Sequence, residues 1–205
     1  LLLIDDSILI DCPPTALASL RRTNTSPSDI NSILFTHWHG DHYFGFPFLI
    51  LERKWISDRE GNVQLGIHGP PGCKNRLTEL CELAYPGSMS DRLDSFEWNE
   101  EMQGKVQCSP EWSFQRFEVE HEIEVDPHGY IMTHESGVKM MHTGDSGPCD
   151  AIATRAGDCD VVVMEMGVPE EVVIPSHFRP STVAALANDN PGTIFLVTHT
   201  WLDDP

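Results

Sequence analysis

Apolar and polar residues alternate in short blocks along this chain, and the blocks predict an alternation of strands and helices. The apolar segments 1–4 and 7–11 flank Asp5-Asp6-Ser7, which is typical of a hairpin. Pro13-Pro14 then opens a helix expected to run to about Arg22, because proline is favoured in the first helical turn. Further strands are predicted at 32–36, 63–68, 105–108, 113–120, 129–134, 138–142, 159–165 and 193–198.

Residues with helical spacing lie between these strands. A helix over 73–84 is predicted by the recurrence of Leu77, Leu80, Cys81 and Ala84. Other helical segments are expected from 43 to about 56, near 148–156 and over 181–188. Residues 87–104, rich in Ser, Asp, Glu and Asn, predict no regular element and are expected to form a mobile loop near the functional site. The pattern as a whole predicts an α/β fold.

Length and composition limit the number of domains and the cellular location that can be expected. The 205 residues predict a single domain, 1–205, truncated at both ends, because there is no initiating Met and the chain stops soon after His199. No apolar run approaches the roughly 18 residues of a membrane span, so no membrane association is expected and a cytoplasmic location is predicted. The six cysteines form no Cys-x-x-Cys pair and indicate free thiols of a reduced compartment; a secreted protein with three disulfides is the alternative.

The densest chemical signal follows the predicted strand 32–36. Four metal-binding side chains lie within six residues, namely His37, His39, Asp41 and His42. Imidazole and carboxylate are ligands that Zn²⁺ prefers, and four of them this close can hardly all face one ion. Alternate side chains of an extended segment share a direction, so the two residues before Gly40 are expected to face one ion and the two after it a second. The cluster predicts a two-metal platform rather than a His-rich surface loop.

This segment matches the His-x-His-x-Asp-His signature of the metallo-β-lactamase superfamily, which the chain therefore resembles. The resemblance implies an αββα four-layer sandwich, in which two mixed β-sheets are flanked by helices, with a binuclear metal site at one sheet edge. It also implies a third ligand His at the end of a strand. The alternating segment 114–120 ends in His121, which is therefore preferred over His128 and His134.

Two later segments resemble the family's last ligand motifs. Thr143-Gly144-Asp145-Ser146 looks like the segment that supplies the bridging carboxylate, Asp145, whereas His142 before it is expected to pack. The strand 193–198 ends in His199, which completes the set.

By the same resemblance, two ions with a bridging hydroxide are expected, two Zn²⁺ with Mn²⁺ or Fe as alternatives. One ion would take His37, His39, His121 and Asp145, and the other would take Asp41, His42, Asp145 and His199.

Two more residues look like the proton relay of the ribonuclease Z branch of the superfamily. Glu165 ends an apolar strand, and His177 lies in a loop that leads into a helix. A His held by a carboxylate can protonate a leaving alkoxide, which suits phosphodiester cleavage. Asp41, Glu165 and His177 are thus the expected catalytic residues. The alternative is that Glu165 ends a strand in solvent and His177 only orders the loop.

The chain departs from that branch where ribonuclease Z enzymes carry a tRNA-binding arm. Only a hairpin fits between His121 and Asp145, and 13 Lys and Arg against 32 Asp and Glu give a net charge of -19, which repels a polyanion. The expected substrate is therefore a small or cyclic phosphodiester, with extended nucleic acid unlikely as a partner and a homodimer left open. The alternatives are a hydrolase of a lactone, thioester or amide, a tRNA 3′-processing endonuclease, and a non-catalytic member of the superfamily.

Overall fold

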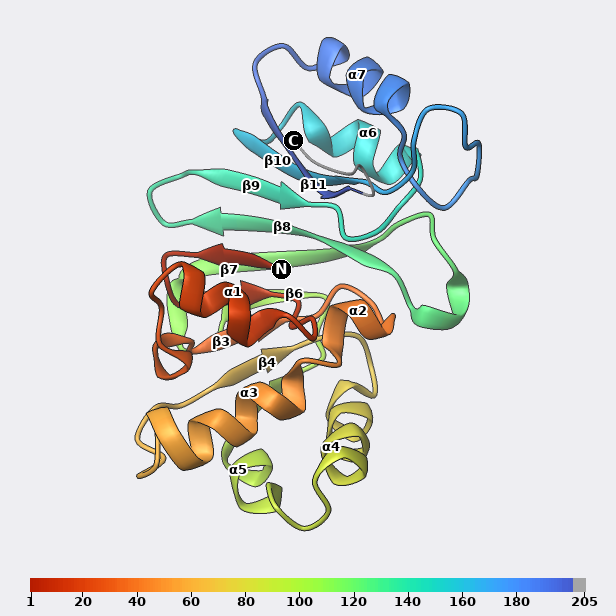
Figure 1. Ribbon diagram of the computed structural model, residues 1–205. Coiled ribbons are helices and arrows are strands. Elements are labelled where there is room, and N and C mark those ends of the chain that lie inside the picture. Colours follow the sequence, from red (N-terminus) through yellow and green to blue (C-terminus); the bar gives the residue numbers. More distant parts are fainter. Residues whose placement is uncertain (201–205) are drawn as a thin grey trace. The chain divides into compact units, whose positions relative to one another are not determined.

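The computed structural model describes residues 1–200, which form two compact units. The first unit contains residues 1–101 and 105–110, and the second contains 102–104 and the residues from 111 onward. Each unit has a mixed β-sheet with helices beside it (Figure 1). Within residues 1–200, no helix combines the length and the apolar character needed to cross a bilayer.

The first unit is built on a five-stranded sheet whose central strands are buried on both faces. In sheet order the strands are β1 (Leu2–Ile4), β2 (Ile8–Ile10), β3 (Ser32–Leu34), β4 (Gly66–His68) and β5 (Glu97–Asn99). Strands β2 to β5 are mutually parallel, and all residues of β2, β3 and β4 are buried. This is why β2 reads as a continuous apolar run, and why the polar Ser32 of β3 and His68 of β4 are also buried.

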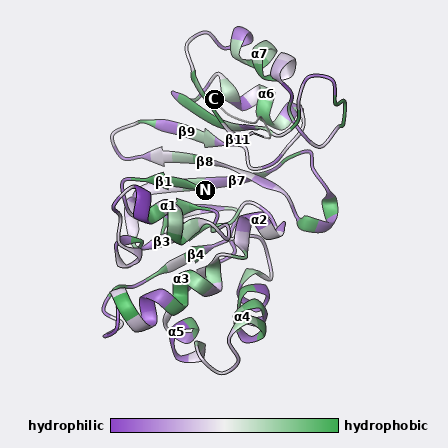
Figure 2. Ribbon diagram, viewed as in Figure 1, coloured by the Kyte–Doolittle hydropathy of each residue, from purple (hydrophilic) through white to green (hydrophobic). Residues whose placement is uncertain are grey.

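The helices of the first unit lie in the segments that connect these strands. They are α1 (Ala16–Arg22), a 3₁₀ turn (Pro27–Asp29), α2 (Gly40–Tyr43), α3 (Phe46–Glu52), a π-helical turn (Arg53–Ser57), α4 (Cys73–Ala84) and α5 (Ser90–Ser95). Figure 2 shows hydrophobic and hydrophilic residues alternating along α4, in which Cys73, Leu77 and Cys81 are buried. The predicted helix 73–84 and the predicted hairpin 1–11, formed by antiparallel β1 and β2, are confirmed.

The second unit packs two helices on a six-stranded sheet. In sheet order the strands are β11 (Ile194–Thr200), β10 (Val161–Met166), β9 (Lys139–His142), β8 (His128–His134), β7 (Ser109–Glu118) and β6 (Gln103–Val106), and the helices are α6 (Asp150–Ala156), α7 (Pro180–Asp189) and a 3₁₀ turn (Ile123–Val125). Ile131, Met141, Val162 and Phe195 are paired across four adjacent strands and so share one face. These residues belong to the core that also contains Ile152 and Val183 of the helices.

The expectation of a mobile loop over 87–104 is wrong. The segment contains α5, and it contains β5, which pairs in parallel with β4. Met89 and Leu93 are buried, and the indole N–H of Trp98 donates to the Leu93 carbonyl at 3.1 Å. Met89, Leu93 and Trp98 are spread among many polar residues, so the composition of the segment is typical of a loop. The strand forms because β5 pairs with β4, which is distant in sequence.

The cysteines carry no cross-links. All six, at positions 12, 73, 81, 108, 149 and 159, are free thiols. Burial raises the pKa of Cys81 to about 12, which disfavours its thiolate and suits an inert packing role. The three disulfides of a secreted protein are therefore not formed in this structure.

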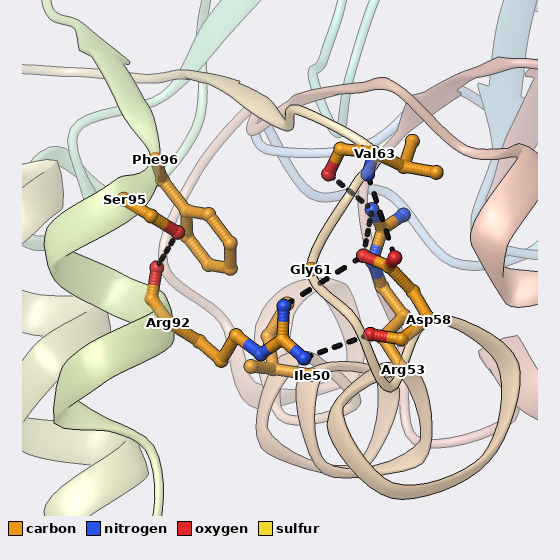
Figure 3. Close-up of a pocket in the computed structure, with 8 residues that line it drawn as sticks. All are labelled: Ile50, Arg53, Asp58, Gly61, Val63, Arg92, Ser95 and Phe96. Atoms are coloured by element: carbon orange, nitrogen blue, oxygen red, sulfur yellow. Dashed lines mark hydrogen bonds and ion pairs between the residues drawn. The ribbon is translucent and has the colours of Figure 1, made fainter.

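A buried guanidinium fixes the long connection between α3 and β4. Arg53, which is 4% exposed, donates to the carbonyl oxygens of Pro27, Ile30 and Val63. Its Nη2 also lies 3.7 Å from Asp58, which Arg92 approaches at 3.9 Å. Figure 3 shows the guanidinium groups of Arg53 and Arg92 directed toward the segment 58–63, which lines a small pocket. The network replaces the hydration that these buried polar groups lose.

Replacing Arg53 by Met should destabilise the first unit. The change leaves three carbonyl groups and the Asp58 carboxylate without this donor, so we expect a loss of about 3 kcal/mol in the free energy of unfolding. Denaturation in urea measures this change in the free energy of unfolding. Arg59→Met is the matched control, because Arg59 is exposed, and it should change stability by less than about 0.5 kcal/mol. Equal stability of the two variants would contradict a structural role for the network.

Candidate metal centre

In the first unit, two neighbouring parallel strands end at the same edge of the sheet, and the residues that follow them form one cluster. Strands β2 and β3 pair Ile10 with Leu34, so Asp11 and the residues after β3 leave the sheet side by side. Asp11 has a left-handed backbone with φ 63°, which turns the chain after β2. After β3 the chain runs through Thr36 to His39, whose carbonyl accepts the amide N–H of His42 and so begins α2.

This turn gathers the four residues of the sequence motif. The ring centroids of His37 and His39 are 5.0 Å apart, and those of His37 and His42 are 4.0 Å apart. The Nε2 atom of His42 lies 3.6 Å from the Asp41 carboxylate. His37 and His42 are buried, whereas the Asp41 side chain is largely exposed. Three imidazoles and one carboxylate therefore converge at the edge of the first sheet.

Asp11 sets the orientation of two of these rings. Its carboxylate accepts the Thr36 amide at 2.8 Å, the Thr36 hydroxyl at 2.8 Å and the Nδ1–H of His42 at 2.8 Å. Because the Thr36 hydroxyl proton goes to Asp11, the hydroxyl oxygen can only accept from Nδ1–H of His37, 3.0 Å away. Both rings then carry their proton on Nδ1 and keep Nε2 for a ligand role.

The charge of Asp11 fits this task. Burial by itself raises the pKa of this carboxyl, but the neighbouring His42, by charge and by hydrogen bond, outweighs burial and brings the pKa to about 2. The carboxylate is therefore ionised throughout the neutral range and can hold the donor protons of its partners.

In the second unit, three parallel strands end together and carry three more polar residues. Strand β10 pairs with both β9 and β11, so Asp145 after β9, Glu165 in β10 and His199 in β11 lie at one edge. The pairing of β10 with β11 shifts register between Glu165 and Met166, and His199 adopts φ 50° at this irregularity. Such a bulge redirects a side chain. The Nε2 atom of His199 lies 3.4 Å from Asp145.

His121 reaches the same edge through contacts that follow β7. An isolated bridge joins Glu120 to Gly147, which brings the residue after Glu120 beside Asp145. A Cβ at Gly147 would lie 1.6 Å from the Pro175 carbonyl oxygen, so only glycine permits this approach. The next carbonyl, that of Ser176, accepts Nδ1–H of His121 at 2.9 Å. Ligand atoms of His121, Asp145 and His177 consequently lie within 4.8 Å of one another.

Glu165 and His177 form a pair. The Glu165 carboxylate, 1% exposed, accepts the backbone N–H groups of Ser146, Gly167 and Phe178 and the Nδ1–H of His177 at 2.8 Å. The hydrogen bond to Glu165 is the main cause that raises the pKa of His177, against its partial burial. Glu165 therefore holds the imidazole of His177 in place beside His121.

The structure brings the predicted site residues together within each unit. His37, His39, Asp41 and His42 gather in the first, and His121, Asp145, Glu165, His177 and His199 gather in the second.

The less favoured histidines lie elsewhere in the second unit. His128 and His134 are at opposite ends of β8, where they contact Asp126 and Ser136. His142 is buried and accepts the Gly144 amide.

Sequence reasoning missed Asp11 and the hydroxyl of Thr36. The signal for Asp11 was present, since three fully buried residues, Ile8 to Ile10, lead directly into a carboxylate. The same pattern of a buried strand ending in an acid pointed to Glu165. Asp11 was missed because the hairpin 1–11 already accounts for the apolar residues that precede it.

Comparisons with known proteins agree with this geometry. A family model described as a beta-lactamase superfamily domain matches residues 6–200. The chain belongs to the metallo-β-lactamase superfamily. Its fold, two mixed sheets flanked by helices, is shared by the crystal structure of the short form of human tRNase Z (TM-score 0.74, 19% identity, 97% of this chain and 84% of that chain) and by a diphosphatase of the PhnP family (TM-score 0.65, 16% identity, 96% and 70%).

Curated relatives of this metallo-β-lactamase-fold chain are named ribonuclease Z. The protein of Streptococcus sanguinis is 31% identical over 121 residues, which are 58% of this chain and 38% of that protein. The protein of Methanosarcina mazei is 22% identical over 238 aligned positions, 94% of this chain and 77% of that protein. The match thus spans well under half of the first relative's length.

The donors present fit the metal ions that this superfamily implies. Neutral imidazole and carboxylate are the ligands that Zn²⁺ takes in hydrolytic sites. In each unit a second residue holds the Nδ1 side of a histidine, Asp11 for His42 and the Ser176 carbonyl for His121, as is usual for metal-binding imidazoles. The chain is therefore a member of the metallo-β-lactamase superfamily with candidate metal-binding clusters.

Asp11→Asn should weaken metal binding without removing any candidate ligand. The carboxylate accepts with both oxygens, the Thr36 N–H at Oδ1 and the Thr36 hydroxyl and His42 Nδ1–H at Oδ2, whereas Asn places a donor NH2 group at one of these positions, so the rings lose their fixed orientation. We expect a loss in metal affinity of about 10- to 100-fold, measured by competition with a chromophoric chelator. Asp6→Asn is the control, because exposed Asp6 has a similar left-handed backbone (φ 54°) and should bind as the parent does. Equal affinities of the two variants would refute the orienting role.

Proposed function

We propose that this protein is a binuclear metal-dependent phosphodiesterase that cleaves a small or cyclic phosphodiester. The observation that carries the proposal is the Glu165–His177 pair, whose Nδ1 to Oε1 distance is 2.8 Å and which lies beside Asp145. An acid of this kind is needed where an alkoxide leaves phosphorus, and is of little use where the leaving group is a good one.

The resemblance to the family supplies the ligand sets. His37, His39, His121 and Asp145 would hold one ion, and Asp41, His42, Asp145 and His199 the other. When bound, two such cations would lower the pKa of a water and stabilise the charge of an in-line displacement at phosphorus. Zn²⁺ suits the imidazole-rich sets, with Mn²⁺ or Fe as alternatives. Asp41, the most exposed of the group, is also counted among the catalytic residues.

His177 has the properties of a general acid. Its Nδ1 proton is held by Glu165, so Nε2 is the nitrogen that can deliver a proton to a leaving oxygen. The carboxylate beside it raises the pKa of His177, which keeps more of the ring protonated near neutral pH. Three backbone N–H groups fix Glu165, so the ring cannot easily rotate away from its position.

The surroundings of His121 favour a small substrate over a polyanion. The run 118–126 carries five carboxylates at alternate positions. Three of them, Glu118, Glu120 and Asp126, line a pocket of about 400 Å³ beside His121. Between His121 and Asp145 the chain forms only a 3₁₀ turn and the β8–β9 hairpin. An acidic wall at this position and a net charge of -19 both oppose the approach of a phosphate backbone.

A tRNA 3′-processing endonuclease is the second candidate, favoured by the names of the ribonuclease Z relatives. The alignment with the Methanosarcina mazei protein spans 238 positions, more than the 205 residues of this chain, so that relative contains segments that this chain lacks. Missing segments and an acidic wall make this candidate the weaker one. The cytoplasmic location and a homodimer stay predictions.

One panel of substrates tests the proposal. Metal-reconstituted protein is assayed with bis-p-nitrophenyl phosphate, a 2′,3′-cyclic nucleotide, a neutral lactone, a thioester and a tRNA precursor, and bound metal is counted in the same sample. Two ions with turnover of the first two substrates are expected. Turnover of the lactone or thioester alone would move the protein to another hydrolase class, and preferred cleavage of the tRNA precursor would establish the endonuclease.

His177→Ala should slow the reaction without emptying the metal site. We expect a fall in kcat of about 10² to 10⁴ for a substrate with a poor leaving group, the usual contribution of general acid catalysis. The fall of the parent rate at high pH, where His177 loses its proton, should vanish in the variant. His134→Ala, at the far end of β8, should keep the parent rate. A variant that loses bound metal would instead show that His177 is a ligand, a role that its distance to Asp145 also allows.

A further inference from the structure

A carboxylate that the superfamily motif does not include lies directly on the candidate metal site of the second unit. Glu122 follows His121 in sequence, and the 3₁₀ turn Ile123–Val125 begins immediately after it. This turn folds the Glu122 side chain back, so that its Oε2 lies 2.7 Å from His121 Nε2. The His121 side chain is 1% exposed and that of Glu122 is 49% exposed, so the carboxylate approaches the ring from solvent.

The nitrogen that Glu122 contacts is the one available for an ion. The Ser176 carbonyl can only accept, so His121 Nδ1 must carry the proton of that hydrogen bond. Nε2, whose proton faces Glu122 at 2.7 Å, is the nitrogen that an ion would bind in place of that proton. A metal ion bound to Nε2 would therefore meet the Glu122 carboxylate at once.

The charge of Glu122 reaches a second histidine of the cluster. Its charge acts on both His121 and His177, whose ring centroids are 4.9 Å apart. The same two rings offer ligand atoms within 4.8 Å of Asp145. Glu124, in contrast, is an exposed member of the same acidic run and lies within the 3₁₀ turn.

We propose that Glu122 is an additional ligand of the ion that His121 would hold, placed at the solvent side of the site. A second carboxylate adds a hard oxygen donor to an imidazole-rich set, which favours Mn²⁺ and Fe²⁺ relative to Zn²⁺. Glu122 thus widens the range of metal ions that the site retains. The inference rests on the metal site of the proposed function and is independent of the substrate.

The test measures metal binding alone. Stepwise affinities for Mn²⁺ and Zn²⁺ are determined by chelator competition for the parent protein, Glu122→Gln, Glu124→Gln and Asp145→Asn. We expect Glu122→Gln to weaken Mn²⁺ binding at one site at least tenfold and Zn²⁺ binding less, with Glu124→Gln within twofold of the parent. Asp145→Asn should lose affinity for both ions and serves as the reference for a lost ligand.

The Co²⁺-loaded proteins give a second readout, because the visible bands of Co²⁺ respond to its ligands. Glu122→Gln should change these bands, and Glu124→Gln should leave them unaltered. Parent-like affinity and spectrum in Glu122→Gln would overturn the inference, and so would tighter binding, which would make Glu122 a competitor that the ion displaces. Failure of the parent itself to bind ions would refute the proposed function instead.

Discussion

The constraint on which the candidate site depends is the burial of a carboxylate at the end of a strand. Such a group is costly unless donors surround it, so the chain must bring N–H and O–H groups to fixed positions around it. Asp11 does this in the first unit, with the amide and hydroxyl of Thr36 and the ring of His42. The orientation of His42, and through Thr36 that of His37, follows from satisfying this one charge.

The second unit uses the same arrangement with a different result. Glu165 is buried at the end of β10, accepts three backbone N–H groups and holds the Nδ1–H of His177. In both units a buried carboxylate fixes the tautomer of an imidazole and turns Nε2 toward the cluster. In the proposed function Asp11 prepares His42 as a metal ligand, whereas Glu165 prepares His177 as a proton donor.

Negative charge around His121 has two consequences that act together. The carboxylates of 118–126 oppose a polyanionic substrate, and one of them, Glu122, is placed on the ring nitrogen that would bind an ion. In the proposed function, acidic residues in this position would limit the substrate to one with a single phosphate group, and Glu122 would add a ligand to the metal site.

The sequence by itself determined the fold class, the residues of the candidate site and most of the elements. The spacing of His37 to His42 and the strand-end positions of His121, Asp145 and His199 depend on local patterns, and so does the helix 73–84. Tertiary structure alone decided the role of Asp11, because its partner Thr36 lies on another strand and the contact requires parallel pairing of β2 and β3. It also decided the strand within 87–104, which forms by pairing with β4, and the contact between Glu122 and His121, which depends on a turn that no composition signal marks. Local patterns record which residues can bind or pack, whereas the backbone geometry of distant segments decides which of them meet.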